Sequence, residues 1–159
     1  MIKENKKAPA FKLPSTDGKD FELKTKLPNH LILYFYPKDN TPGCTTESVE
    51  FAKNYKTLQK MKVDVIGVSK DSIESHKKFI DKFKFPFPLL SDETTKVLKL
   101  YDAWGEKSMY GKKFMGIKRT TVFIQKNSKI IKIWTDVKVK NHVDEVIMFI
   151  ENLFQLKKL

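Results

Sequence analysis

The chain has 159 residues, of which 40% are hydrophobic and 31% charged, as expected for a globular protein with a sizeable core. No run approaches the roughly 18 apolar residues of a membrane span, and no apolar segment follows the charged residues 1–7 to form a secretory signal. The one cysteine excludes a disulfide within the chain. We therefore expect one domain over residues 1–159, with no membrane partner, in a reducing compartment, most simply the cytoplasm.

The formal net charge is +12, which raises the question of a nucleic-acid partner. The basic residues are 30 lysines, spread over every segment, and a single arginine. Proteins that read nucleic acids favour arginine forks and clustered basic faces. The scattered lysines therefore indicate a compositional bias, and we expect no specific nucleic acid as partner.

The N-terminal part of the chain predicts a β-hairpin and a buried strand. Residues 11–13 and 21–23 alternate apolar and polar side chains, and the Asp-Gly pair at 17–18 between them is a turn signal. Residues 31–36 are six consecutive large apolar or aromatic side chains, which is typical of a strand buried on both faces. Pro37 has no amide proton for a ladder, so it ends this strand.

The rest of the chain alternates helical and extended patterns. In chain order we expect a helix over 42–60, a strand over 63–68, a helix from 71 or 72 to about 84, a short extended piece over 86–91, a helix over 92–101, a loop over 104–116, two strands over 120–125 and 130–134 joined as a hairpin, and a helix over about 141–156. This order predicts an α/β protein with a mixed central sheet flanked by helices, which is the plan of a thioredoxin-like fold with an N-terminal β-hairpin.

The most informative stretch is the turn that leads from the buried strand into the first helix. Thr41 and Pro42 form a helix-start signal, a hydroxyl residue followed by proline, so Cys44 is expected in the first helical turn. The positive end of the helix dipole and the free amide groups there favour a thiolate. The Thr41 hydroxyl can reach the sulfur or a bound oxygen, and Gly43 leaves room for a small substrate.

A lone cysteine is more often a small buried hydrophobic residue than a nucleophile. Here its neighbours are proline, glycine and threonine at a strand-to-helix turn, and these favour a reactive site.

Three residues of this turn carry a resemblance to a known family. Pro37, Thr41 and Cys44 match the peroxiredoxin motif P-x-x-x-T-x-x-C, and residues 36–47 resemble the bacterioferritin comigratory protein, or peroxiredoxin Q, branch. The likeness runs from Ala8 to the C-terminal helix. It implies a thiol-dependent peroxidase of thioredoxin-like fold, in which Cys44 attacks hydrogen peroxide or an organic hydroperoxide, becomes a sulfenic acid and needs no cofactor or metal. Pro37 would shield that sulfenic acid.

Arg119 is the second candidate for the site. It is the one arginine among 31 basic residues, so this position calls for a planar, permanently charged fork rather than a point charge. It precedes the strand predicted over 120–125. The segment 116–121 resembles the peroxiredoxin segment whose arginine contacts the sulfur and the peroxide, which implies the same role for Arg119.

The chain departs from its apparent relatives in having no resolving cysteine. Many members of the branch that it resembles place a resolving cysteine five residues after the nucleophile, where this chain has Val49. Others place it in the following helix, and the helix predicted over 72–84 has no cysteine. The resemblance then implies a one-cysteine enzyme, recycled by a small thiol, a thioredoxin, a glutaredoxin or a second subunit, and we expect a monomer. The lysines at 107, 112 and 113 are either solvated charge or a docking patch for an acidic redox partner.

Other interpretations remain open from the sequence. The chain could be a thioredoxin-like protein that senses or binds peroxide without turnover, or a basic nucleic-acid-associated protein. The histidines at 30, 76 and 142 lack metal-ligand spacing, so we expect capping or surface roles for them.

Overall fold

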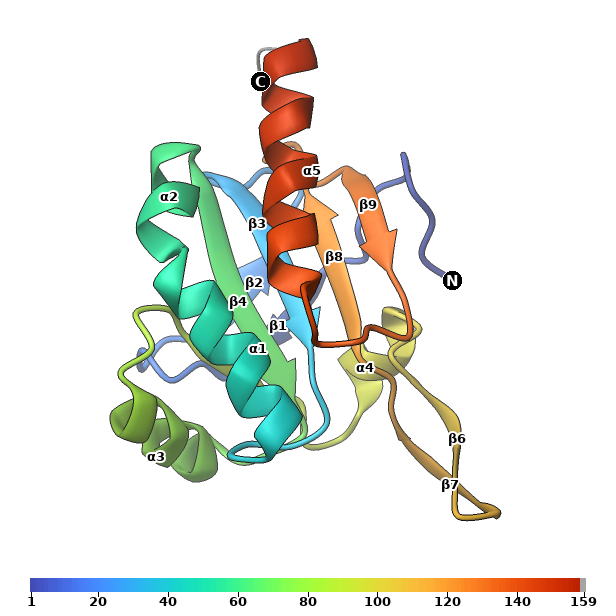
Figure 1. The fold of residues 1–159 in the computed structure, drawn as a ribbon. Helices are drawn as coiled ribbons and strands as arrows, with labels where there is room; N and C mark the ends of the chain where they lie inside the picture. Colours follow the sequence, from blue (N-terminus) through green and yellow to red (C-terminus); the bar gives the residue numbers. More distant parts are fainter. Residues whose placement is uncertain (158–159) are drawn as a thin grey trace.

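The computed structural model describes residues 1–157 and shows one five-stranded sheet with helices on both faces (Figure 1). The strands are β1 (Phe11–Leu13), β2 (Phe21–Leu23), β3 (His30–Phe35), β4 (Val63–Ser69), β5 (Leu89–Ser91), β6 (Trp104–Met109), β7 (Lys112–Ile117), β8 (Thr120–Ile124) and β9 (Ile130–Trp134). The helices are α1 (Pro42–Lys53), α2 (Tyr55–Lys60), α3 (Ile73–Phe83), α4 (Lys96–Leu100) and α5 (His142–Lys157). The predicted α/β class with a mixed central sheet is confirmed.

Strand β3 is the centre of this sheet, whose order is β5-β4-β3-β8-β9. It pairs in parallel with β4 and antiparallel with β8, and all six of its residues are buried. The predicted strand buried on both faces is thus confirmed. Its C-terminal end leads directly into the turn that precedes α1, the helix that carries Cys44.

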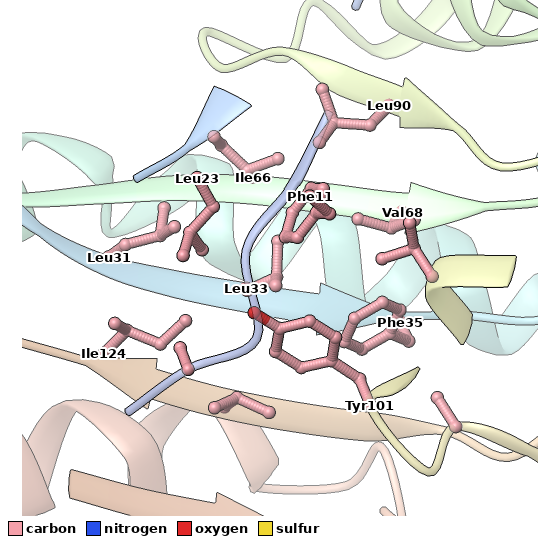
Figure 2. Close-up of a cluster of buried hydrophobic side chains, with 14 of the residues drawn as sticks. Phe11, Leu23, Leu31, Leu33, Phe35, Ile66, Val68, Leu90, Tyr101 and Ile124 are labelled. Carbon is pink, nitrogen blue, oxygen red and sulfur yellow. The ribbon is translucent and has the colours of Figure 1, made fainter. Parts of the chain in front are cut away.

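One face of the sheet is covered by the β1–β2 hairpin and by α4. The hairpin brings Phe11 and Leu23 onto side chains of β3 and β4, as Figure 2 shows. Tyr101, which follows α4, packs against Phe35 with ring centroids 5.4 Å apart, and its hydroxyl donates to the Pro9 carbonyl at 2.6 Å. The predicted N-terminal β-hairpin is therefore present, and it closes this half of the core.

The opposite face is covered by α1, α2, α3 and α5 (Figure 1). The predicted C-terminal helix is confirmed, and it buries side chains at helical spacing: Val143, Val146, Ile147 and Ile150. These side chains pack in one cluster with Cys44 and Phe51 of α1. The helix that carries the cysteine is therefore fixed from two sides, by the sheet and by α5.

Three element predictions differ from the structure. The helix expected over 92–101 begins at Lys96, after a turn at residues 93–94. The helix expected over 42–60 is interrupted at Asn54, whose backbone leaves the helical region and whose side-chain amide donates to the Glu50 carbonyl at 2.8 Å. The loop expected over 104–116 is a β-hairpin of β6 and β7. Its turn residues, Tyr110 and Gly111, both have positive φ (52° and 77°), the pattern of a type I′ turn.

No helix among residues 1–157 combines the length and apolar character that a membrane crossing requires.

Candidate active site

Cys44 lies at the base of the turn between β3 and α1. The turn spans residues 37–41, includes Asn40 in the left-handed region (φ 60°), and ends with Thr41 in an extended conformation before Pro42 begins the helix. Cys44 is therefore in the first turn of α1, as predicted, and its residue is 1% exposed. The first amide groups of a helix lack partners within the helix, and the helix dipole favours negative charge near this end.

Arg119 contacts the sulfur. It lies between β7 and β8, and its Nη2 donates to Cys44 Sγ at 3.2 Å, while its Nη1 donates to Glu47 Oε1 at 2.7 Å. Cys44 and Glu47 are three residues apart on α1 and so share one face of the helix. One planar guanidinium thus bridges the sulfur and a buried carboxylate.

The space beside Gly43 is occupied by this guanidinium. A Cβ atom built on Gly43 would lie 3.3 Å from Arg119 Nη2 and 3.7 Å from a methyl of Val139. The glycine therefore lets the arginine approach the first turn closely. The sequence analysis expects a small substrate in this space, whereas the structure places the Arg119 guanidinium there.

Thr41 and Pro37 shape the turn. The Thr41 hydroxyl donates to the Lys38 carbonyl at 2.8 Å and makes no side-chain bond to the helix amides, although the residue occupies the predicted N-cap position. Pro37 is half-buried. Together with Arg119 it lines a hollow whose other walls come from β6, Lys118 and residues 136–138. Pro37 and Arg119 are thus the predicted site residues that border this hollow.

The buried Glu47 carboxyl has an unusual environment. Burial raises its pKa to about 7, although the neighbouring Arg119 opposes the shift. Its Oε1 accepts from the arginine, whereas its Oε2 has no hydrogen-bond partner within residues 1–157 and lies 3.9 Å from His142 Nε2. The carboxyl is therefore divided between its ionised and protonated forms near neutral pH.

His142 completes this buried group from α5. Its burial and the charge of Arg119 lower its pKa to about 4, so the ring is neutral at pH 7. Its Nε2 is 2.8 Å from the Thr121 hydroxyl. The arginine charge is thus shared by one sulfur and one carboxyl, with a neutral ring beside them.

Comparison with known proteins identifies the family to which this site belongs. Residues 5–133 match the AhpC/TSA family. Peroxiredoxin Bcp of Bacillus subtilis is 40% identical over 152 residues, which cover 96% of this chain and 97% of the relative. Peroxiredoxin Bcp of Escherichia coli is 39% identical over 144 residues, 91% of this chain and 92% of the relative.

Solved structures give the same result. The bacterioferritin comigratory protein of Xanthomonas campestris, described for its alkyl peroxide reduction activity, has a TM-score of 0.84 at 36% identity and covers 89% of this chain and 90% of its own. A yeast mitochondrial 1-Cys peroxiredoxin has a TM-score of 0.84 at 29% identity, over 99% of this chain and 79% of its own. This chain belongs to the peroxiredoxins of the AhpC/TSA family.

Membership fixes the reaction class. The peroxiredoxin is a thiol peroxidase, an oxidoreductase that takes a hydroperoxide as substrate and a thiol-type reductant as electron donor. The sensing or binding interpretation gains no support from these relatives.

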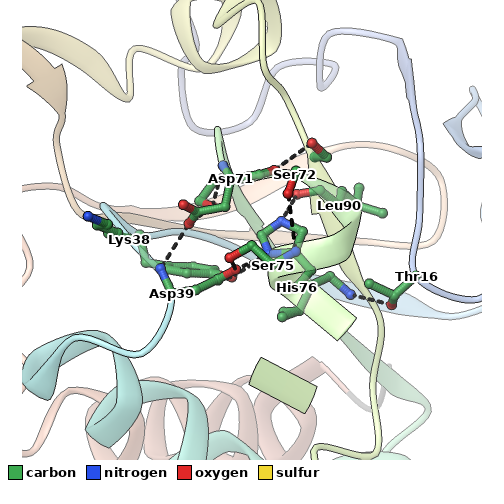
Figure 3. Close-up of polar contacts among 12 residues, drawn as sticks. Thr16, Lys38, Asp39, Asp71, Ser72, Ser75, His76 and Leu90 are labelled. Carbon is green, nitrogen blue, oxygen red and sulfur yellow. Dashed lines mark hydrogen bonds and ion pairs between the residues drawn. The ribbon is translucent and has the colours of Figure 1, made fainter. Parts of the chain in front are cut away.

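The peroxiredoxin turn is also held from the side opposite Arg119, by a buried polar network that Figure 3 shows. Asp39 accepts from the Tyr36 hydroxyl at 2.5 Å and from the Ser75 hydroxyl at 2.8 Å, and its Oδ2 is 2.7 Å from His76 Nδ1. His76 Nε2 donates to the Leu90 carbonyl at 2.7 Å, and the Asp39 amide donates to Asp71 at 2.8 Å. The turn is thereby tied to α3, β5 and the end of β4.

The expected surface or capping role of His76 is wrong, since the ring is fully buried. Asp39, Asp71 and His76 offer ligand atoms within 4.8 Å of one another, as a metal site would. However, these atoms already bind donors and acceptors of the protein. We therefore interpret the group as a structural network.

The structure thus brings four of the predicted site residues, Pro37, Gly43, Cys44 and Arg119, around one site, with Thr41 holding the turn. Sequence reasoning missed Glu47 and His142. The spacing of Glu47 from Cys44 on a predicted helix could have revealed the first, whereas no local signal marks the second.

Proposed function

We propose that Cys44 is the peroxidatic nucleophile and that Arg119 is the group that stabilises charge as the peroxide reacts. The observation that supports this is the 3.2 Å contact between Arg119 Nη2 and Cys44 Sγ at a helix N-terminus. A cation beside the sulfur favours the thiolate, which is the reactive form.

The reaction is a displacement at oxygen. The thiolate attacks the terminal oxygen of the hydroperoxide, an S–O bond forms and the O–O bond breaks. The bond's electron pair leaves with the second oxygen as hydroxide or alkoxide, which takes a proton from solvent in the hollow. Sulfur is oxidised to the sulfenic acid and the peroxide is reduced.

The transition state spreads negative charge from sulfur to the leaving oxygen. Arg119 already touches the sulfur and lines the hollow, so its fork can donate to both ends as the charge moves. Gly43 supports this role because it admits the guanidinium. Thr41 would contribute by fixing the turn, and its hydroxyl would have to leave the Lys38 carbonyl to donate to the peroxide. Pro37 would shield the sulfenic acid from the hollow.

We further infer that residues 1–159 act as one domain, since both side-chain clusters lie on the two faces of a single sheet. We propose a monomer that works in the cytoplasm, without nucleic acid or membrane as partner. A thioredoxin, a glutaredoxin or a small thiol would return the sulfenic acid to the thiol, because the chain has one cysteine.

The Cys44→Ser variant tests the assignment. Serine has nearly the same shape but is a far weaker nucleophile, so we expect peroxide consumption to stop while the fold is retained. The measurement is hydrogen peroxide loss with a thiol reductant present, together with the urea unfolding curve. Thr45→Ser, one residue further along α1, is the matched control and should keep its activity. Peroxidase turnover at the wild-type rate in Cys44→Ser would show that the nucleophile lies elsewhere.

A further inference from the structure

Among residues 1–157, exposed large apolar side chains are concentrated on the β6–β7 hairpin. Its strands pair only with each other, and the hairpin projects away from the central sheet (Figure 1). Four of the eight exposed large apolar side chains among residues 1–157 are on it: Met109 (57% exposed), Tyr110 (98%), Phe114 (42%) and Met115 (56%). Exposed apolar side chains gathered in this way are typical of an interaction surface.

The register of the hairpin separates its charges onto two faces. Directly opposite residues share a face, and successive pairs alternate. Lys107 pairs with Phe114, and Met109 pairs with Lys112. We call these four residues the hairpin face; they combine two cations with two large apolar side chains and include no acid.

The other face of the hairpin carries the acid. There Glu106 pairs with Met115, Ser108 pairs with Lys113, and the Lys113 ammonium lies 3.8 Å from the Glu106 carboxylate. The Lys118 stem lies across Gly105, because a Cβ atom on that glycine would be 2.9 Å from Lys118 Cε. Lys118 therefore extends the positive charge of the hairpin face towards the site.

The hairpin also forms a wall of the hollow beside the turn over residues 37–41, which precedes the helix of Cys44. Residues 106–108 of β6 line that hollow together with Pro37 and Arg119, and Arg119 contacts Cys44 Sγ. Cys44 is the one cysteine of the chain and is almost fully buried. A reductant that approaches the sulfur through this hollow must therefore lie against β6.

We propose that the hairpin face is the docking surface for a small dithiol protein with an acidic surface around its reactive thiol. This inference rests on the proposed function of Cys44. Positive charge on the hairpin face and a chain charge of +12 attract an acidic partner and exclude a basic one. The methionine and phenylalanine supply an adaptable apolar contact.

The docked partner performs a balanced two-step reduction. Its first thiolate attacks the sulfur of Cys44 sulfenic acid, an S–S bond forms, the S–O bond breaks, and the oxygen leaves as water after taking a proton. Its second thiolate then attacks the partner's own sulfur in that mixed disulfide. Cys44 leaves as the thiolate, and the dithiol is oxidised to a disulfide.

The test compares a protein reductant with a small one. Cys44 is first oxidised with one equivalent of hydrogen peroxide, and its reduction is followed with an acidic bacterial thioredoxin and, separately, with dithiothreitol. The variants are Lys112→Glu and Phe114→Ser on the hairpin face. Lys113→Glu on the opposite face and Lys60→Glu on α2 are matched controls for charge.

We expect each hairpin-face variant to lower the second-order rate with thioredoxin by about ten-fold, which corresponds to the loss of one good contact at an interface. Reduction by dithiothreitol and oxidation by peroxide should remain at the wild-type rates, and the controls should change the thioredoxin rate by less than about three-fold. Raising the salt concentration should slow the reduction of the wild type by thioredoxin more than it slows the reduction of Lys112→Glu.

The outcomes separate this inference from the proposed function. If peroxide does not oxidise Cys44 in the wild type, the proposed function fails. If oxidation is normal but thioredoxin reduces the hairpin-face variants as fast as the wild type, or fails to reduce the wild type, the docking surface is wrong. Inhibition of the thioredoxin reaction by a single-stranded oligonucleotide, relieved by Lys112→Glu, would assign the surface to nucleic acid instead.

Discussion

The Arg119 guanidinium binds two partners at once, and a lysine at this position would bind them less well. Its two terminal nitrogens donate to Cys44 Sγ and Glu47 Oε1, which lie on successive parts of one helix face. An ammonium group carries the same charge but is a compact point donor without a rigid fork. This double contact gives a physical reason for one arginine in a chain that otherwise uses lysine.

Arg119→Lys should therefore slow the oxidation of Cys44 by hydrogen peroxide ten-fold or more, on the order of the loss of one transition-state donor. The measurement is the single-turnover rate at pH 7, with the urea unfolding curve as the check on folding. Lys56→Arg, an exposed position on α2, is the control for the exchange of these two residue types. A wild-type rate in Arg119→Lys would show that the fork is dispensable for the reaction.

Local sequence signals were sufficient for the part of the site that one turn supplies. Pro37, Thr41 and Cys44 belong to a strand-to-helix connection. Its proline marks the end of the strand, and its hydroxyl residue followed by proline marks the start of the helix, whatever the rest of the chain does. His142 is different, because it reaches Glu47 only through the packing of α5 on α1. A contact between distant segments leaves no local pattern, and so the sequence did not reveal it.

The same distinction applies to whole elements. Strand β3 and helix α5 were predictable because continuous apolar runs and helical spacing report burial directly. The β6–β7 hairpin was not, because its apolar side chains face solvent and its turn uses Tyr110 and Gly111 rather than the common Asn-Gly pair. The break at Asn54 was also missed, since asparagine is a weak helix breaker.

The Asp39 network joins the turn over residues 37–41 to α3, and its loss should lower the stability of the protein and the proposed reactivity of Cys44. In Asp39→Asn the side chain keeps its shape but loses the charge that faces His76 and accepts from two hydroxyl groups. We expect the free energy of unfolding to fall by about 3 kcal/mol, as for other buried pairs that lose one partner. We also expect slower oxidation of Cys44, because the turn is held less firmly.

The measurements are urea unfolding and single-turnover oxidation at a temperature where the variant is fully folded. Asp81→Asn, at an exposed position on α3, is the control and should leave the free energy of unfolding and the oxidation rate unchanged. Amide hydrogen exchange over residues 38–45 provides the decisive readout, and it should become faster in Asp39→Asn alone. Unchanged exchange there, with lower global stability, would limit Asp39 to a role in the stability of α3.

At the scale of the whole molecule, two buried groups of the candidate site make the free energy of unfolding depend on pH. Glu47 and His142 are both buried beneath the helical layer, and burial shifts their pKa values in opposite senses, to about 7 and about 4. The folded state therefore holds a proton on Glu47 more tightly, and a proton on His142 less tightly, than the unfolded chain does. Each shift changes the free energy of unfolding by roughly 3 kcal/mol across its range.

The two contributions have opposite signs. The Glu47 contribution is fully present below its unfolded pKa of 4.5 and is lost as the pH rises through about 7. The His142 contribution is present above its unfolded pKa of 6.5 and is lost as the pH falls through about 4. Between pH 4.5 and 6.5 the two slopes oppose each other, so these two contributions to the free energy of unfolding should nearly cancel there.

Glu47→Gln should remove the Glu47 contribution to the pH dependence of the free energy of unfolding and leave the His142 contribution. The stability of this variant relative to the wild type should then rise by about 3 kcal/mol between pH 4.5 and pH 7.5, whatever constant offset the lost contact with Arg119 introduces. Urea unfolding at four pH values measures this difference. Glu50→Gln, one turn along α1 and more exposed, should give a curve parallel to the wild type. Parallel curves for Glu47→Gln and the wild type would mean that the Glu47 carboxyl ionises in the folded protein as it does in the unfolded chain.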